Sequence, residues 1–162
     1  MARLAAVNLR EVQEFDIVAN KITFIENEPK VFYKVVLRFK NHYPLPGQQA
    51  MSQPEETIVN FKQFSDFKRL DTIIKLSCYN LDESGHYMPV LPSKRNALSG
   101  NKKSGDELQF ELVEYMRDLL KIPLLQRMYY LRLFLSVNEY HPNVSEQTFN
   151  DMSIMSPRQA TG

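Results

Sequence analysis

The sequence has few of the features that would assign it at once to a major class of proteins. A single cysteine, Cys78, among 162 residues excludes an internal disulfide framework and fits a reducing compartment. No apolar run approaches the ~18 residues of a membrane-spanning helix, and the apolar part of residues 1–10 is too short for a secretory signal. The net charge of +1 gives no overall field that would attract nucleic acid. We therefore expect a globular cytoplasmic domain without nucleic-acid partners, whose basic surfaces are local.

Signatures of catalysis and of metal binding are also missing from the sequence. The three histidines, His42, His86 and His141, lie in separate loop or tail segments without metal-ligand spacing. The sequence contains no glycine-rich phosphate loop and no recognisable nucleophile-and-base motif. We expect a binding module rather than an enzyme, with no cofactor and no metal.

Alternating hydrophobicity predicts three strands in the first half of the chain. Residues 15–26 are rich in β-branched and aromatic side chains, and residues 31–40 alternate most clearly between two faces. The turn between them predicts an antiparallel hairpin. After a proline-containing loop at 41–54, residues 55–64 alternate again. These runs predict an antiparallel meander.

Helical periodicity follows the third strand. Ser65 predicts the N-cap of a first helix, and Ser104 with Glu107 predicts a capping box at the start of a second. Pro123 ends the second helix and opens a third. The predicted helices are residues 65–77, 105–122 and 123–137. The fold class is therefore α+β: a three-stranded antiparallel meander followed by a three-helix half, with a long proline-containing loop between helices 1 and 2.

The expected domain organisation has three parts. Residues 1–9 are an N-terminal extension, and residues 10–137 form the domain. Residues 138–162 are polar, contain Pro142 and Pro157 and have no periodicity. We expect this C-terminal tail to be mostly disordered.

The segment Phe64-Ser65-Asp66-Phe67 joins the last strand to the first helix. Together with the preceding strands, the proline loop that ends in a lysine, and the helix–proline–leucine junction from Tyr115 to Leu125, it resembles the Phox-homology (PX) domain family. The resemblance spans roughly residues 10–137. It implies a peripheral protein that binds phosphoinositides on endosomal or other intracellular membranes, with a role in trafficking or sorting.

The resemblance also implies where the lipid head group binds. In the family, an arginine, an aromatic residue, a lysine and a second arginine hold the head group. Here the aromatic residue is Phe64 and the lysine is Lys94, with Arg95 beside it. Gln63 replaces the arginine that pairs with the 3-phosphate, and Leu108 occupies the position of the second arginine. Because glutamine adds no charge, we expect weak binding or a preference other than the 3-phosphate.

Further basic and apolar residues complete the set of candidates. Lys62 lies next to Gln63, although strand alternation points it to the opposite face unless the strand contains a bulge. The proline loop has the composition of a loop that contacts an anionic bilayer, through Val90, Leu91, Leu98, Lys102 and Lys103. Lys68 and Arg69 at the start of the first helix predict an accessory basic site. A solvated loop and a solvated helix face are the alternative interpretations.

Two functions remain open at this point. The first is a membrane-targeting phosphoinositide-binding module with an atypical head-group site. The second is a PX-fold protein–protein interaction domain that has lost lipid binding and contacts a protein partner through the PX surface or the tail. The uncharged residues Gln63 and Leu108 motivate the second interpretation, whereas the basic and apolar loop favours the first.

Overall fold

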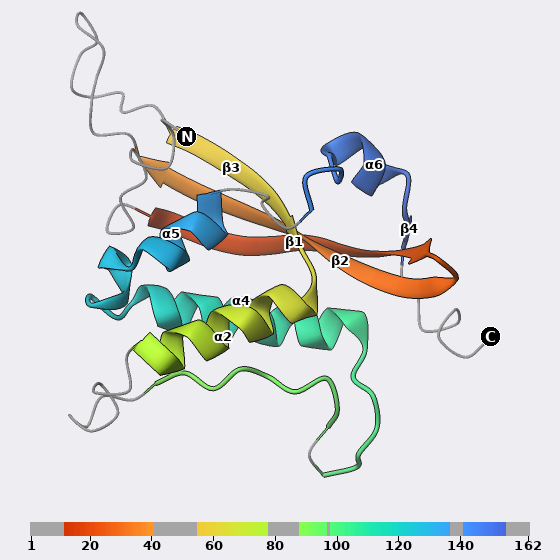
Figure 1. Cartoon of the computed structure of the whole chain (residues 1–162), viewed down its shortest axis with the longest axis horizontal. Coiled ribbons are helices and arrows are strands. Elements are labelled where there is room, and N and C mark those ends of the chain that lie inside the picture. The colour runs from red at the N-terminus through yellow and green to blue at the C-terminus, as the bar shows by residue number, and fades with distance from the viewer. Residues whose placement is uncertain (1–11, 41–54, 78–87, 97, 137–140, 155–162) are drawn as a thin grey trace, which may run out of the picture.

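A four-stranded antiparallel sheet organises the structure, a computed structural model that describes residues 12–40, 55–77, 88–96, 98–136 and 141–154. The strands are β1 (Val12–Ile25), β2 (Glu28–Lys40), β3 (Glu55–Lys62) and β4 (Ser153–Ile154). The helices are α2 (Phe64–Ser77), α4 (Gly105–Leu120), the 3₁₀ helix η2 (Leu125–Arg127), α5 (Tyr129–Ser136) and α6 (Glu146–Asn150). Helices α2, α4 and α5 lie on one side of the sheet and α6 on the other (Figure 1). The α+β fold class is confirmed.

The predicted meander is confirmed, with strand order β3-β2-β1-β4. Strands β1 and β2 are joined by a two-residue turn at Glu26 and Asn27, whose φ angles are 53° and 66°. Two positive φ angles are what a tight hairpin turn needs to follow the twist of its strands. The turn is shorter than predicted, so β2 begins at Glu28 rather than at Val31.

The main core lies between the sheet and its helical side. Tyr33, Val35 and Leu37 of β2 are buried there, as their alternation predicts. They meet apolar side chains of the three helices on that side, which include Phe67, Leu70, Ile74, Leu112, Met116, Leu119, Leu131 and Phe134. This core fixes α2, and with it the end of β3, where the candidate site begins.

The opposite face of the sheet is covered by a segment for which the sequence predicts disorder. Within the described part of the tail, residues 141–154 instead form α6 and β4. Phe149 of α6 is 1% exposed and packs against Phe32 and Phe61. β4 pairs with β1, with Lys21 opposite Ile154. The prediction differs from the structure because this docking depends on contacts with distant parts of the chain, and so short a segment shows no periodicity.

The third predicted helix is broken. Residues 125–127 form η2, Met128 is extended, and α5 begins at Tyr129. Helix α4 begins one residue after Ser104, whose side chain accepts from the Glu107 amide, one of the two hydrogen bonds of the predicted capping box. Within the described residues, no helix is both long enough and apolar enough to cross a membrane.

Candidate functional site

The first turn of α2 is fixed by the buried carboxylate of Asp66. Its Oδ2 accepts from the Gln63 amide at 2.7 Å and lies 2.7 Å from Nε2 of His141. Burial raises the pKa of Asp66, but hydrogen bonds from His141 and Gln63 and the charges of His141 and Lys62 outweigh it and leave this pKa below its usual value. Gln63 precedes the helix and Ser65 lies inside its first turn, so the prediction of Ser65 as the N-cap is wrong.

Lys62 is buried on the helical side of the sheet. It is 1% exposed, and its Nζ lies 4.8 Å from the centroid of the Phe134 ring. Its charge also acts on Asp66. These contacts compensate the buried ammonium group from within the fold. Because its side chain is buried, Lys62 does not reach a ligand at the surface. This position argues against its predicted role as a lipid-binding residue.

Phe64 and Lys94 are brought together by α2 and the proline loop. The Lys94 Nζ lies 5.0 Å from the centroid of the Phe64 ring, within the range of a cation–π contact. Phe64 is 9% exposed, so its ring is largely buried and contacts the Lys94 side chain. The two residues that the resemblance names for the head-group site thus share one place on the surface.

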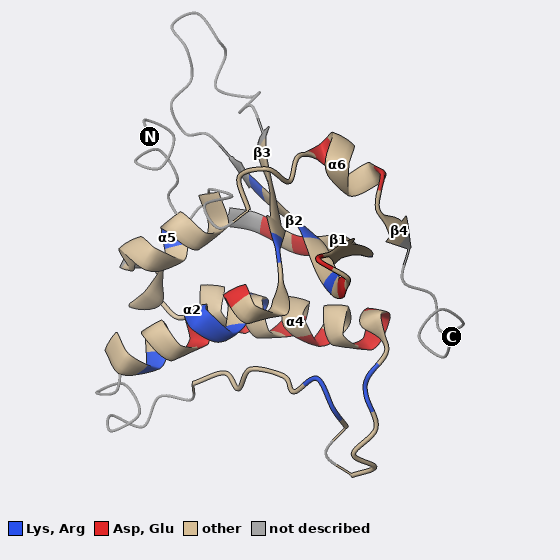
Figure 2. Cartoon of the chain, turned by 45° about the vertical axis from the view of Figure 1, so that its right-hand side comes forward, with Lys and Arg blue, Asp and Glu red and all other residues tan. Residues whose placement is uncertain are grey.

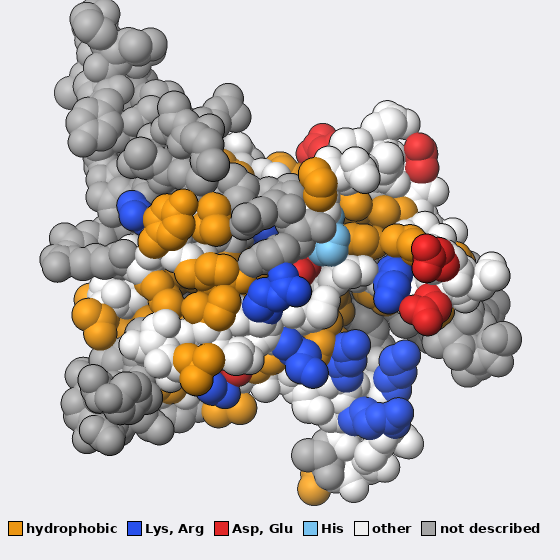
Figure 3. Space-filling model, viewed as in Figure 1, with side chains coloured by type: hydrophobic (Ala, Val, Ile, Leu, Met, Phe, Trp, Pro, Cys, Tyr) orange, Lys and Arg blue, Asp and Glu red, His pale blue; other side chains and the backbone are white. Residues whose placement is uncertain are grey.

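Other ammonium groups surround Lys94. Burial lowers the pKa of Lys94, and the positive charges of Lys102, Lys68 and Lys30 lower it further. Figure 3 shows basic side chains gathered on the face where the proline loop, α2 and the β1–β2 hairpin meet. Figure 2 shows the same concentration of basic residues along the loop that precedes α4. The site is locally positive although the chain is nearly neutral.

The start of the described loop is anchored to the core. Pro89 is buried, and Met88 and Leu91 pack against the main core cluster. Val90 between them is 71% exposed. Of the apolar loop residues predicted to contact a membrane, Val90 is therefore available, whereas Leu91 is engaged in packing.

The loop then forms a small β-hairpin, which we call the loop hairpin (residues 94–96 and 98–103). Arg95 and Lys102 form its bridge, and the Lys103 amide donates to the Lys94 carbonyl at 2.9 Å. Gly100 has a φ of 69°, a conformation that favours glycine, in the turn. Leu98 in this turn is fully exposed. The loop hairpin thus carries the apolar side chain of Leu98 at its tip and the basic residues Arg95 and Lys102 in its strands.

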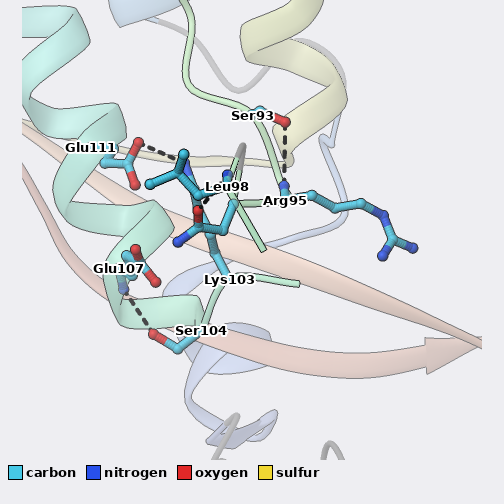
Figure 4. Close-up of polar contacts among 8 residues, drawn as sticks. Ser93, Arg95, Leu98, Lys103, Ser104, Glu107 and Glu111 are labelled. Atoms are coloured by element: carbon cyan, nitrogen blue, oxygen red, sulfur yellow. Dashed lines mark hydrogen bonds and ion pairs between the residues drawn. The ribbon is translucent and has the colours of Figure 1, made fainter. Parts of the chain in front are cut away.

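The other basic residues of the loop hairpin differ in their availability. The Lys103 Nζ pairs with Glu111 at 2.8 Å and its side chain is 11% exposed, so Lys103 holds the loop to α4. Arg95 is exposed, and its side chain points away from the Lys103–Glu111 pair (Figure 4). Its Nη1 donates to the Gly100 carbonyl at 3.2 Å. Arg95 remains at the surface, whereas Lys103 does not.

The remaining residues predicted for the site also divide into exposed and buried ones. Lys68 and Arg69 are exposed on α2, and Lys68 belongs to the charges around Lys94. Gln63 is partly exposed, but Leu108, which we predicted at the position of the second arginine, is 7% exposed in the main core. Leu108 therefore offers nothing to a ligand.

Among the described residues, Lys30 is a cation near Lys94 that the sequence analysis did not find. It lies near the start of β2, far along the chain from the proline loop. Its proximity to Lys94 arises from tertiary packing of the β1–β2 hairpin, for which no local sequence signal exists.

Within the described residues, no group of His, Cys, Asp or Glu could hold a metal ion. Anion binding is the chemistry that this arrangement supports.

Comparisons with known proteins complete the description. A family model described as "PX domain" matches residues 50–138, which is more than half of the chain. No curated protein sequence matches the chain. Among solved structures, the chain is similar to "X-ray structure of a designed CISK-PX domain", with 15% sequence identity and a TM-score of 0.47; the alignment covers 75% of this chain and 97% of that chain.

Proposed function

The chain belongs to the PX domain family, and from this premise we propose that it is a peripheral membrane-targeting module that binds phosphoinositides through Phe64 and Lys94. The family is one of phosphoinositide-binding, non-catalytic modules. The observation that carries the proposal is the Lys94 ammonium group, held 5.0 Å above the Phe64 ring and surrounded by further cations. Lys94 is exposed and has no carboxylate partner among the described residues, so it favours an anionic ligand.

The loop hairpin supplies the contact with the bilayer in this proposal. Leu98 at its tip enters the apolar layer, where burial of one leucine side chain contributes about 1.5–3 kcal/mol. Arg95 and Lys102 at its base face the anionic head groups, each contributing about 1 kcal/mol. Together with the head-group contact, these terms support reversible rather than permanent association. We propose a trafficking or sorting role on endosomal or other intracellular membranes.

The replacement at Gln63 modifies the expected affinity. A glutamine amide donates hydrogen bonds but lacks the charge and the forked geometry of a guanidinium group. We therefore propose weak binding, or a head-group preference other than the 3-phosphate.

A second candidate function follows from the same replacement. Gln63 is uncharged and Leu108 is a core residue, so both positions of the family's arginines lack charge. A PX-fold domain that binds a protein partner instead of lipid would show this pattern. It predicts that the protein sediments with no anionic vesicle at low salt.

Vesicle sedimentation of the whole chain separates the two functions. We expect the wild type to sediment with vesicles that contain phosphoinositides, and the Lys94→Gln variant to lose at least about five-fold in affinity, since one basic residue near an anionic surface contributes about 1 kcal/mol. Lys121→Gln is the matched control, because Lys121 is exposed at the end of α4, where its one partner among the described residues is Asp118. Equal binding of both variants would contradict the assigned site.

A further inference from the structure

His141 joins the C-terminal part of the chain to the first turn of α2. Its Nε2 lies 2.7 Å from Oδ2 of Asp66, and its ring meets the Phe32 ring edge-on, with the ring centroids 5.1 Å apart. Both side chains of the pair are largely buried, with 16% of His141 and 4% of Asp66 exposed. The PX domain model matches residues 50–138. The contact therefore links the matched part of the chain to a segment that follows it.

The segment that carries His141 has its own attachments to the sheet. We call residues 141–154 the tail segment. Phe149 of α6 is 1% exposed, and β4 pairs with β1. The ammonium group of Lys34 pairs with Glu146 at 3.4 Å. Because these contacts do not involve the imidazole, we expect the tail segment to stay docked when the His141 side chain alone is replaced.

Asp66 connects His141 to the candidate site. Its Oδ2 accepts from the Gln63 amide at 2.7 Å, and its own amide donates to the Gln63 carbonyl at 3.0 Å. This reciprocal pair fixes the backbone at the start of a helix, as a capping box does. Phe64, the first residue of α2, follows directly, and its ring contacts Lys94. One oxygen of Asp66 thus has two partners, one in the site and one in the tail segment.

The ionised form of Asp66 depends on His141. Burial favours the neutral acid and is the largest influence on the pKa of Asp66. Hydrogen bonds from His141 and Gln63 and the positive charges of His141 and Lys62 together outweigh burial, so this pKa lies below its usual value. Asp66 is therefore ionised at neutral and at mildly acidic pH. Without His141, the Gln63 amide and Lys62 are left to oppose burial, and the pKa of Asp66 rises.

From this geometry we propose that His141 is a positioning residue of the head-group site, whose hydrogen bond to Asp66 holds the first turn of α2 in the binding conformation, including at mildly acidic pH. The inference rests on the proposed function and adds the tail segment to the site. Coupling between two equilibria is reciprocal. A process that pulls the tail segment from the sheet therefore weakens head-group binding, and a bound head group stabilises the docked tail segment.

Two substitutions at His141 separate its hydrogen bond from its bulk. His141→Phe keeps an aromatic ring against Phe32 but has no donor. His141→Gln provides an amide nitrogen that can donate to Asp66 in place of Nε2. Glu146→Gln is the matched control, because it removes the ion pair between the tail segment and Lys34 and leaves the contact with Asp66 intact.

The first test needs no ligand. Nuclear magnetic resonance of the whole chain measures hydrogen exchange of the Gln63 amide and the pH titration of the Asp66 carboxyl carbon. We expect His141→Phe to speed this exchange and to raise the pKa of Asp66, while the Phe149 signals stay as in the wild type. His141→Gln and Glu146→Gln should leave the exchange unchanged. Unchanged exchange and titration in His141→Phe would overturn the inference. Loss of the native Phe149 signals in that variant would assign His141 to tail docking and would also overturn it.

The second test measures binding to vesicles that contain phosphatidylinositol bisphosphate. Affinities are compared as ratios of wild type to variant at each pH, because the ratio cancels any protonation of the lipid itself. For His141→Phe we expect a ratio of about five at a pH of about 5 and of less than about two at a pH of about 7.5, since the net contribution of one hydrogen bond corresponds to about a five-fold change. His141→Gln and Glu146→Gln should give ratios near that of the wild type at both pH values.

The failure of the inference differs from the failure of the proposed function. A ratio for His141→Phe that does not change with pH, or binding by His141→Gln that is as weak as that by His141→Phe, would overturn the positioning role while membrane binding stands. A wild type that sediments with no vesicle would overturn the proposed function. The exchange of the Gln63 amide would then still decide whether His141 holds the first turn of α2.

Discussion

At the scale of single residues, Gln63 is the position where we expect the phosphate-binding arginine of the family to be missing. Its backbone is held by Asp66, whose carboxylate accepts the Gln63 amide at 2.7 Å. The side chain is partly exposed next to Phe64. The backbone support for a binding residue is thus in place, while the side chain lacks charge.

A single substitution should therefore restore a 3-phosphate contact. We expect Gln63→Arg to increase affinity for 3-phosphorylated head groups by at least about ten-fold, because a hydrogen bond to a charged group contributes about 1.5–3 kcal/mol. Titration with vesicles that contain phosphatidylinositol 3-phosphate measures the change. Gln147→Arg, on exposed α6, adds the same charge elsewhere and serves as the control. An equal gain in both variants would show that net charge alone is responsible.

Some residue-level properties could be predicted from the sequence and others could not. Strand alternation predicts that Lys62 points away from the face of Gln63, and in the structure Lys62 is buried whereas Gln63 is partly exposed. The full burial of Lys62 could not be predicted, because lysine is rarely buried without partners. Phe134, over whose ring its ammonium group lies, is distant in the sequence, and Asp66 comes near only through the turn from β3 into α2. The pairing of Lys103 with Glu111 depends likewise on the docking of the loop against α4.

At the scale of elements, hydrophobic periodicity predicted the long helices and strands and did not predict the short ones. Strands β1 to β3 and helices α2 and α4 follow clear patterns and are confirmed within a few residues. Helix α6 has only five residues and is stabilised by tertiary contacts. Its sequence signals are the Ser145–Thr148 capping box and the isolated Phe149. The loop hairpin could not be predicted either, because it depends on Gly100 and on anchoring of the loop to the core.

The docking of α6 leads to a prediction about stability. Phe149 is 1% exposed against Phe32 and Phe61, so Phe149→Ala should lower the free energy of unfolding by about 3–5 kcal/mol. Phe110→Ala is the matched control, because Phe110 is 67% exposed on α4 and should cost no more than about 0.5 kcal/mol. Urea unfolding of the whole chain measures both. Equal effects would show that residues 141–154 are dispensable for the fold.

At the scale of the whole molecule, the charge and the apolar surface are unevenly distributed. The sheet is covered on one side by α2, α4 and α5 and on the other by α6, so its two faces are engaged in folding (Figure 1). The loop before α4 extends beyond this body and carries the basic surface and exposed Leu98 (Figure 2). A net charge of +1 conceals this asymmetry. We therefore predict one orientation on a membrane, with the loop hairpin toward the bilayer.

The absence of tryptophan from the chain makes that orientation directly measurable. A Leu98→Trp variant carries a single reporter at the tip of the loop hairpin. A Leu76→Trp variant carries the same reporter at another exposed leucine, in the last turn of α2, at the opposite end of that helix from Phe64. On addition of vesicles that contain phosphatidylinositol bisphosphate, we predict a blue shift of the emission and quenching by brominated lipid acyl chains for Leu98→Trp alone. Sedimentation without a shift at position 98, or equal shifts at both positions, would contradict membrane docking through the loop hairpin.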